Sequence, residues 1–464
     1  MSNDRAEQTI ESMLHLPDGR LLLRISAPII ASLMVQGFYS LADSVFLSRL
    51  GEKALSAMSL SFVVQSLAAA FFSGIATGIN ALVSRSLGRR DGAGARAVAV
   101  SGFLVQGLFV LLFTLFGLFG TRLYFARSTA DEEVIALGVR YLGPCLSLIL
   151  FSAAQVTLER TLQATGITRY VLYVQAAGTA VNLILDPILI FGWLGFPALG
   201  VLGAAWATIL GQLTAACLAL YFNIRHNGPL FHGLLQQVRP RLSLMGAVAG
   251  IGIPSAMAGV GSALGNYCIN RILIDFSATA NAAFGVYTKV QAVAVLPTQG
   301  LSMGLVTLLS FFYGRRDLRR FRGTLLKGEL FLGGWGLFCV LMFTLFPGVL
   351  ISVFTPTEQM LEVGIPCFRL IGTTYLFSAL MGGCGAYFQT TGKPLYPLII
   401  TLFRQVLIRI PAALYLAMLG VIHRIWWCWP ISELVSDAVC LALFLHAYPA
   451  FLRTFSHTNI IETE

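Results

Sequence analysis

Charged side chains are scarce in this sequence. Asp, Glu, Lys and Arg make up 11% of its 464 residues, and hydrophobic residues make up 56%, whereas a soluble domain carries roughly 25% charged residues. The apolar/polar alternation of a half-buried strand is also absent, and apolar stretches recur at lengths near the ~20 residues that cross a bilayer as helix. The composition therefore excludes an ordinary soluble domain and predicts membrane-spanning helices.

The apolar stretches predict an all-α polytopic membrane protein whose chain crosses the bilayer many times. Several stretches exceed the length of one straight crossing, so tilt or extension into the interface is expected. Twelve spans are expected, near residues 22–48, 56–86, 98–121, 136–158, 169–192, 200–223, 244–274, 281–312, 328–353, 363–388, 395–419 and 425–450.

Paired cysteine and histidine motifs are missing. None of the eight cysteines forms a CxxC pair, and the six histidines show no HExxH spacing, so neither a disulfide framework nor a zinc site is predicted and no cofactor is expected. The cysteines all fall in apolar stretches, as small core residues would: Cys145, Cys217, Cys268, Cys339, Cys367, Cys384, Cys428 and Cys440.

The positive charge is distributed as a topology signal. If the N-terminus is cytoplasmic, 20 of the 31 basic residues fall on the cytoplasmic side and only 6 on the other, the rest lying in or at the ends of spans. This bias predicts a multi-pass protein of the cell inner (plasma) membrane with both termini in the cytoplasm. Residues 1–20 show no cleavable signal peptide. The net charge of +10 is therefore not taken as a sign of nucleic-acid binding.

The sequence repeats itself at one ungapped offset. The segment Gly88-Arg89-Arg90-Asp91 returns 226 residues later, beginning at Gly314. Six spans per half make the halves parallel repeats, related by an axis along the membrane normal. The same offset pairs Pro28 with Pro254, Gln65 with Gln291, Gly74 with Gly300, Gly78 with Gly304, Glu132 with Glu358, Gln163 with Gln389 and Gly166 with Gly392.

The repeat and the longest polar interruption set the expected domains. They are a cytoplasmic segment 1–20, an N-lobe 21–224, a cytoplasmic linker 225–243, a C-lobe 244–450 and a cytoplasmic tail 451–464. Gly74 and Gly78, like Gly300 and Gly304, have the small-xxx-small spacing of close helix contacts.

Two aspartates break the repeat. Asp43 corresponds to Ile269, and Asp186 corresponds to Ala412. A lone carboxylate inside a span costs several kcal/mol and is expected to face a cavity or a partner. Asp43 lies six residues before Arg49, and Asp186 lies seven before Trp193. Both acids are therefore about two helical turns below the outer surface, which predicts one shared site.

Other polar residues share the faces of these acids. Gln36 and Ser40 lie at i−7 and i−4 from Asp43, and Asn182 lies at i−4 from Asp186. Two carboxylates in low dielectric can share and exchange a proton. Their oxygens, with those of Asn182 and Thr208, could instead coordinate Na⁺, and no other metal site is expected. A hydrogen-bonded cluster that only fixes helix packing is the structural alternative.

The second half carries a different polar set within its spans. Lys289 and Arg404 could neutralise Glu433 or Asp437, since ion pairing is the usual state of buried charge in a membrane. A direct role for Lys289 and Arg404 in substrate binding is the alternative. Arg409 lies in the same span as Arg404.

Together these features resemble the multidrug and toxic compound extrusion (MATE) family over roughly residues 15–450. The likeness rests on segments within 28–57, on the repeated Gly-Arg-Arg-Asp, and above all on Asn182-Leu183-Ile184-Leu185-Asp186-Pro187 followed by 200–205. The resemblance implies a drug/cation antiporter with two six-helix lobes around a V-shaped cleft that opens alternately to each side. It also implies that Asp43, Asn182 and Asp186 bind the coupling ion. Some relatives use a glutamate in the seventh span, but 256–268 contains no acid, which places the chain nearer the DNA-damage-inducible-type branch.

The predicted function is therefore ion-coupled export of small amphipathic or cationic substrates. A lipid-linked oligosaccharide flippase of the same superfold is the alternative, but it would need several basic residues along its path. A membrane enzyme would need a nucleophile–base or metal constellation, and none is present in the sequence. A self-contained bundle of this kind could act as a monomer in the lipid bilayer. Substrate identity and the choice between H⁺ and Na⁺ stay open.

Overall fold

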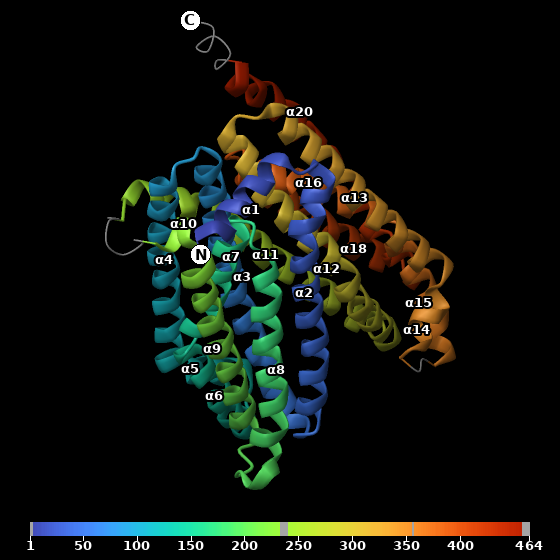
Figure 1. Cartoon of the computed structure of the whole chain (residues 1–464). Coiled ribbons are helices and arrows are strands. Elements are labelled where there is room, and N and C mark those ends of the chain that lie inside the picture. The colour runs from blue at the N-terminus through green and yellow to red at the C-terminus, as the bar shows by residue number, and fades with distance from the viewer. Residues whose placement is uncertain (1–2, 233–239, 355–356, 457–464) are drawn as a thin grey trace, which may run out of the picture. The chain divides into compact units, whose positions relative to one another are not determined.

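The computed structural model describes residues 3–232, 240–354 and 357–456 and consists, over these residues, of helices without strands (Figure 1). Parts of the predicted linker and of the predicted tail lie outside the described residues. The elements are α1 (Asn3–His15), α2 (Asp18–Ser48), α3 (Glu52–Gly88), α4 (Gly92–Leu115), η1 (Phe116–Gly120), α5 (Thr121–Ser128), α6 (Glu132–Ser147), α7 (Leu150–Ala164), α8 (Arg169–Phe191), η2 (Trp193–Gly195), α9 (Val201–His226), α10 (Gly228–Phe231), α11 (Leu242–Phe276), α12 (Ala278–Arg315), α13 (Leu318–Leu345), α14 (Pro347–Ser352), α15 (Glu358–Gly372), α16 (Tyr375–Thr390), α17 (Leu395–Leu402), η3 (Phe403–Ile408), α18 (Arg409–Met418), α19 (Ile422–Ile425) and α20 (Cys428–Ser456).

The prediction of an all-helical membrane protein is confirmed. Eleven helices of the described chain are long and apolar enough to cross a membrane, and the bent pair α6 and α7 makes a twelfth if it is one span. The bend between α6 and α7 is 45°, within the predicted fourth span. Because lipid offers no hydrogen-bond partner, each crossing satisfies its own backbone as a helix.

The chain forms two compact units whose limits differ from the expected lobes. Unit 1 holds residues 1–16 and 27–256, and unit 2 holds 17–26 and 257–464. The first long helix of each half, α2 and α11, therefore begins in one unit and continues in the other. Pro28 and Pro254 lie within three residues of the positions where these helices pass from one unit to the other. A helical proline removes one backbone hydrogen bond. Each boundary between the units therefore lies where backbone hydrogen bonding within the helix is weakest.

Close helix contacts explain the repeated glycines. In unit 1, a Cβ on Gly74 would lie 2.7 Å from the backbone nitrogen of Ala256, and one on Gly78 would lie 2.6 Å from the carbonyl oxygen of Val248. In unit 2, a Cβ on Gly304 would overlap the hydroxyl of Ser26. Glycine thus lets α3 approach the start of α11 and lets α12 approach the start of α2, as small-xxx-small spacing predicts.

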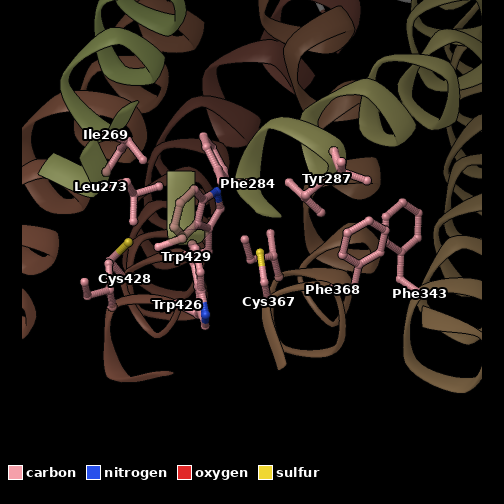
Figure 2. Close-up of a cluster of buried hydrophobic side chains, with 14 of the residues drawn as sticks. Ile269, Leu273, Phe284, Tyr287, Phe343, Cys367, Phe368, Trp426, Cys428 and Trp429 are labelled. Carbon is pink, nitrogen blue, oxygen red and sulfur yellow. The ribbon is translucent and has the colours of Figure 1, made fainter. Parts of the chain in front are cut away.

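Unit 2 has an aromatic core, shown in Figure 2. Trp426 is fully buried, and its ring lies 6.3 Å from that of Phe284. Cys367 and Cys428 are fully buried in the same cluster. All eight cysteines are free thiols, although Cys217 is exposed and so does not have the core position expected of it.

A glycine substitution tests the packing of unit 1. A Cβ on Gly178 of α8 would lie 2.9 Å from the carbonyl oxygen of Gly211 on α9 and 2.8 Å from the Cβ of Ala215. Gly178→Ala should therefore lower stability by about 1–3 kcal/mol, measured as the melting temperature of the protein in detergent. Gly107→Ala is the control, because no atom lies within 4 Å of its new Cβ. Equal melting temperatures for the two variants would contradict the close packing.

Candidate functional site

The two aspartates that break the repeat meet in unit 1. Asp43 lies on α2 and Asp186 on α8, and their carboxyl groups lie close enough to act on one another electrostatically. Asp186 is fully buried, and Asp43 is partly buried. The structure thus brings together the two acids that the depth argument placed in one layer.

The contact between these acids lacks a donor of its own. Within the described part of the chain, neither carboxylate oxygen of Asp186 receives a hydrogen bond from an N–H or O–H group. Two ionised carboxylates are both acceptors, so they cannot hydrogen bond to one another. A proton on one of them, or a cation between them, removes this conflict.

An amide and two hydroxyl groups surround the acid pair. The Nδ2 of Asn182 donates to the Oγ1 of Thr208 at 3.3 Å, and Thr208 in turn donates to the carbonyl of Ala204 at 3.0 Å. The hydroxyl of Tyr39 lies close to Thr208 and to both aspartates. The buried Oδ1 of Asn182 has no donor among the described residues. The site therefore presents amide, hydroxyl and carboxylate oxygens to a cation.

Further polar side chains on α3 and α6 lie near the acid pair. Tyr141 and Cys145 of α6 both lie near Asp43 and near Gln65 of α3. Sequence reasoning missed Tyr39, Tyr141 and Cys145 as members of the site. Tyr39 could have been found, because it lies four residues before Asp43 and so shares its helical face.

The other predicted residues of α2 lie differently. Gln36 and Ser40 are exposed, whereas Asp43 is partly buried. Tyr39, on the same helix, lies close to both aspartates. Gln36 and Ser40 remain predicted cavity residues, because an exposed position can face a cavity or lipid.

In unit 2, the buried charges form ion pairs. The carboxylate of Glu433 lies 3.6 Å from Arg404 and 3.1 Å from Arg409. Arg404 also donates to Ser378 at 3.2 Å. Asp437 lies near Glu433 and Arg404, but neither of its oxygens has a donor in the described chain. The structure therefore places Arg404 and Glu433 together.

Lys289 lies apart from these ion pairs. Its side chain is exposed, and its ammonium lies 5.8 Å from the ring centre of Phe354. No ion pair of Lys289 is present among the described residues. It therefore does not neutralise Glu433.

The apolar helices, the internal repeat and the acid pair of unit 1 are together typical of a polytopic membrane transporter. Comparison with known proteins identifies its family. The MatE family model matches residues 28–188 and 254–415, so the chain belongs to the MatE family. The two matched segments begin 226 residues apart, at the offset of the internal repeat.

The chain is similar to several members of this family over almost its whole length. It is 28% identical to the FAD transporter of Shewanella oneidensis, covering 93% of this chain and 95% of that protein. It is 24% identical to the multidrug export protein MepA of Staphylococcus aureus, covering 93% and 94%.

Solved structures share the fold. One, described as the outward-facing conformation of a multidrug resistance MATE family transporter of the MOP superfamily, matches with a TM-score of 0.88 at 22% identity, covering 95% of this chain and 98% of that chain. Membership of the MatE family makes the protein a multi-pass membrane transporter of an efflux family and not an enzyme.

Removal of one partner tests the buried ion pair of unit 2. Glu433→Gln leaves Arg409, whose side chain is 6% exposed, without its counter-ion. It should lower stability by about 3 kcal/mol or more, measured as a fall in melting temperature. The double variant Glu433→Gln/Arg409→Gln removes both charges and should recover part of the loss. No difference between Glu433→Gln and the unchanged protein would mean that Glu433 does not neutralise Arg409.

Proposed function

We propose that the protein exports small amphipathic or cationic substrates in exchange for a coupling cation, H⁺ or Na⁺, which binds at Asp43 and Asp186. The observation that carries this proposal is the contact between the two carboxyl groups without a donor among the described residues. Intramembrane acids are costly and mark ion pathways. The corresponding residues of the second half, Ile269 and Ala412, carry no charge.

The acid pair supports antiport through mutual exclusion. A cation at the pair neutralises it, and its departure restores negative charge that favours an organic cation nearby. Asn182 and Thr208 add oxygens that suit Na⁺, whereas a shared proton needs only the two carboxylates. Residue chemistry thus leaves both coupling ions open, and the experiment below separates them.

The proposed cycle uses alternating access, with the two repeats rocking against one another as in other parallel-repeat transporters. With the path open to the outside, the cation enters the pair and substrate leaves. After the rocking motion, the cation leaves to the cytoplasm and new substrate binds. We place both termini in the cytoplasm because 20 of the 31 basic residues then lie inside, and we expect the protein to act as a monomer in the plasma membrane.

A flavin dinucleotide is a second substrate class. The similar protein of Shewanella oneidensis is named an FAD transporter, and FAD joins a flat aromatic ring to an anionic pyrophosphate. Lys289 offers an exposed ammonium beside the ring of Phe354, a combination that suits such a ligand. A lipid-linked oligosaccharide flippase is favoured less, because Arg404 and Arg409 are already paired with Glu433.

Efflux from reconstituted vesicles tests the proposal. Ethidium, a flat organic cation, should leave vesicles under an imposed pH gradient or an imposed Na⁺ gradient, and the effective gradient names the ion. Asp43→Asn and Asp186→Asn should each lower gradient-driven efflux by about a hundredfold, because neither amide carries the charge that a cation neutralises. Asp131→Asn, at a surface-exposed carboxylate, is the control and should retain efflux.

The outcomes separate the substrate classes. Movement of FAD but not ethidium under the same gradient would move the assignment to dinucleotides while keeping the coupling site. Full efflux by both aspartate variants would contradict coupling at Asp43 and Asp186.

A further inference from the structure

The polar face of α8 continues beyond the acid pair. Gln175, Thr179 and Asn182 lie at i−11, i−7 and i−4 from Asp186, which puts all of them on one side of the helix. The Nε2 of Gln175 donates to the Oγ1 of Thr179 at 3.4 Å. Eleven residues of helix span about 16 Å. The face therefore leads from the acid pair toward Arg169, where α8 begins.

Hydrogen bonds carry this line across to α7. The Nε2 of Gln155 donates to the Oε1 of Gln175 at 3.1 Å and also to the Oε1 of Glu159 at 3.1 Å. These hydrogen bonds link Thr179 and Gln175 of α8 with Glu159, a third carboxylate of unit 1. Glu159 lies five residues before the end of α7 at Ala164, and so near the same end of the unit as Arg169.

Glu159 has no cationic partner in the described chain. The adjacent Arg160 is 6% exposed, but its guanidinium donates to the Oε1 of Gln163 at 2.9 Å and to the hydroxyl of Ser73 at 3.3 Å. Arg160 acts on Glu159 only as a nearby charge. A partly buried carboxylate held by one amide is an unusual element for packing alone, because burying it unpaired costs several kcal/mol.

The second half lacks the carboxylates at the two ends of this line. At the offset of 226, Met381 stands where Gln155 does, Gly385 where Glu159 does and Ala412 where Asp186 does. Polar residues return only at Thr401 and Gln405, which correspond to Gln175 and Thr179. The two acids and Gln155 are therefore particular to the first half.

We propose that Glu159 is a second cation-binding site of unit 1, through which the coupling cation passes between the Asp43–Asp186 pair and the cytoplasm. This inference rests on the proposed function, including its cytoplasmic termini. The cation is a proton carried by water or a sodium ion, and the oxygens of Thr179, Gln175 and Glu159 hold it in turn. Asp186 loses the cation, Glu159 receives it, and cytoplasmic water takes it from Glu159.

The test compares two transport modes of the same vesicles. Gradient-driven ethidium efflux needs cation movement, whereas exchange of labelled for unlabelled ethidium without a gradient needs only the substrate-loaded steps. Glu159→Gln keeps the acceptor for Gln155 but cannot take up a proton or balance a sodium ion. It should lower gradient-driven efflux by about tenfold or more and leave exchange within a factor of about two of the unchanged protein.

Two further variants sharpen the test. Gln175→Leu interrupts the line without changing any charge, so it should lower gradient-driven efflux in the same direction. Glu132→Gln replaces an exposed carboxylate of the same unit and should leave both modes unchanged. Each variant is measured under the gradient, pH or Na⁺, that drives the unchanged protein.

The outcomes are distinct. Efflux by Glu159→Gln at the unchanged rate would overturn this inference and leave the proposed function standing. Loss of exchange together with efflux would also overturn it, by making Glu159 a substrate or folding residue. Absence of gradient-driven efflux in the unchanged protein would overturn the proposed function and this inference together.

Discussion

The function proposed for this transporter depends on one electrostatic conflict, the contact of two carboxyl groups inside a membrane-spanning unit. Asp43 and Asp186 lie near one another, and the described chain supplies no donor to Asp186. In a medium of low dielectric, two such groups are not both ionised without a neutralising charge. Under the proposed function, a bound proton or cation supplies this neutralising charge.

The two repeats pack their helices in the same way but differ in their buried charges. Both repeats use glycine contacts to pack their helices, as Gly74 and Gly304 show. Their treatment of charge differs, because Glu433 of unit 2 is neutralised by Arg404 and Arg409. Glu433 is thus balanced within unit 2, whereas Asp43 and Asp186 have no basic partner among the described residues of unit 1.

Much of the architecture could be predicted from the sequence, because span length, the basic-residue bias and the repeat each follow from local composition. The meeting of Asp43 with Asp186 could also be predicted, since both lie at one depth. The place of Glu159 in the site could not be predicted. This residue lies near the end of the predicted fourth span, and the hydropathy of that span does not show the bend between α6 and α7. The limits of the two units could not be predicted either. Both α2 and α11 pass from one unit to the other in mid-helix, and the apolar content of the sequence does not mark these positions.

The central claim is that cation and substrate compete through the acid pair, and a binding measurement tests it most directly. Ethidium affinity of the purified protein is measured by titration across a range of pH and, separately, of Na⁺ concentration. The account predicts that affinity weakens as one of these cations rises and that Asp186→Asn removes this dependence, because linkage is reciprocal. An affinity in the unchanged protein that is indifferent to both cations would contradict it.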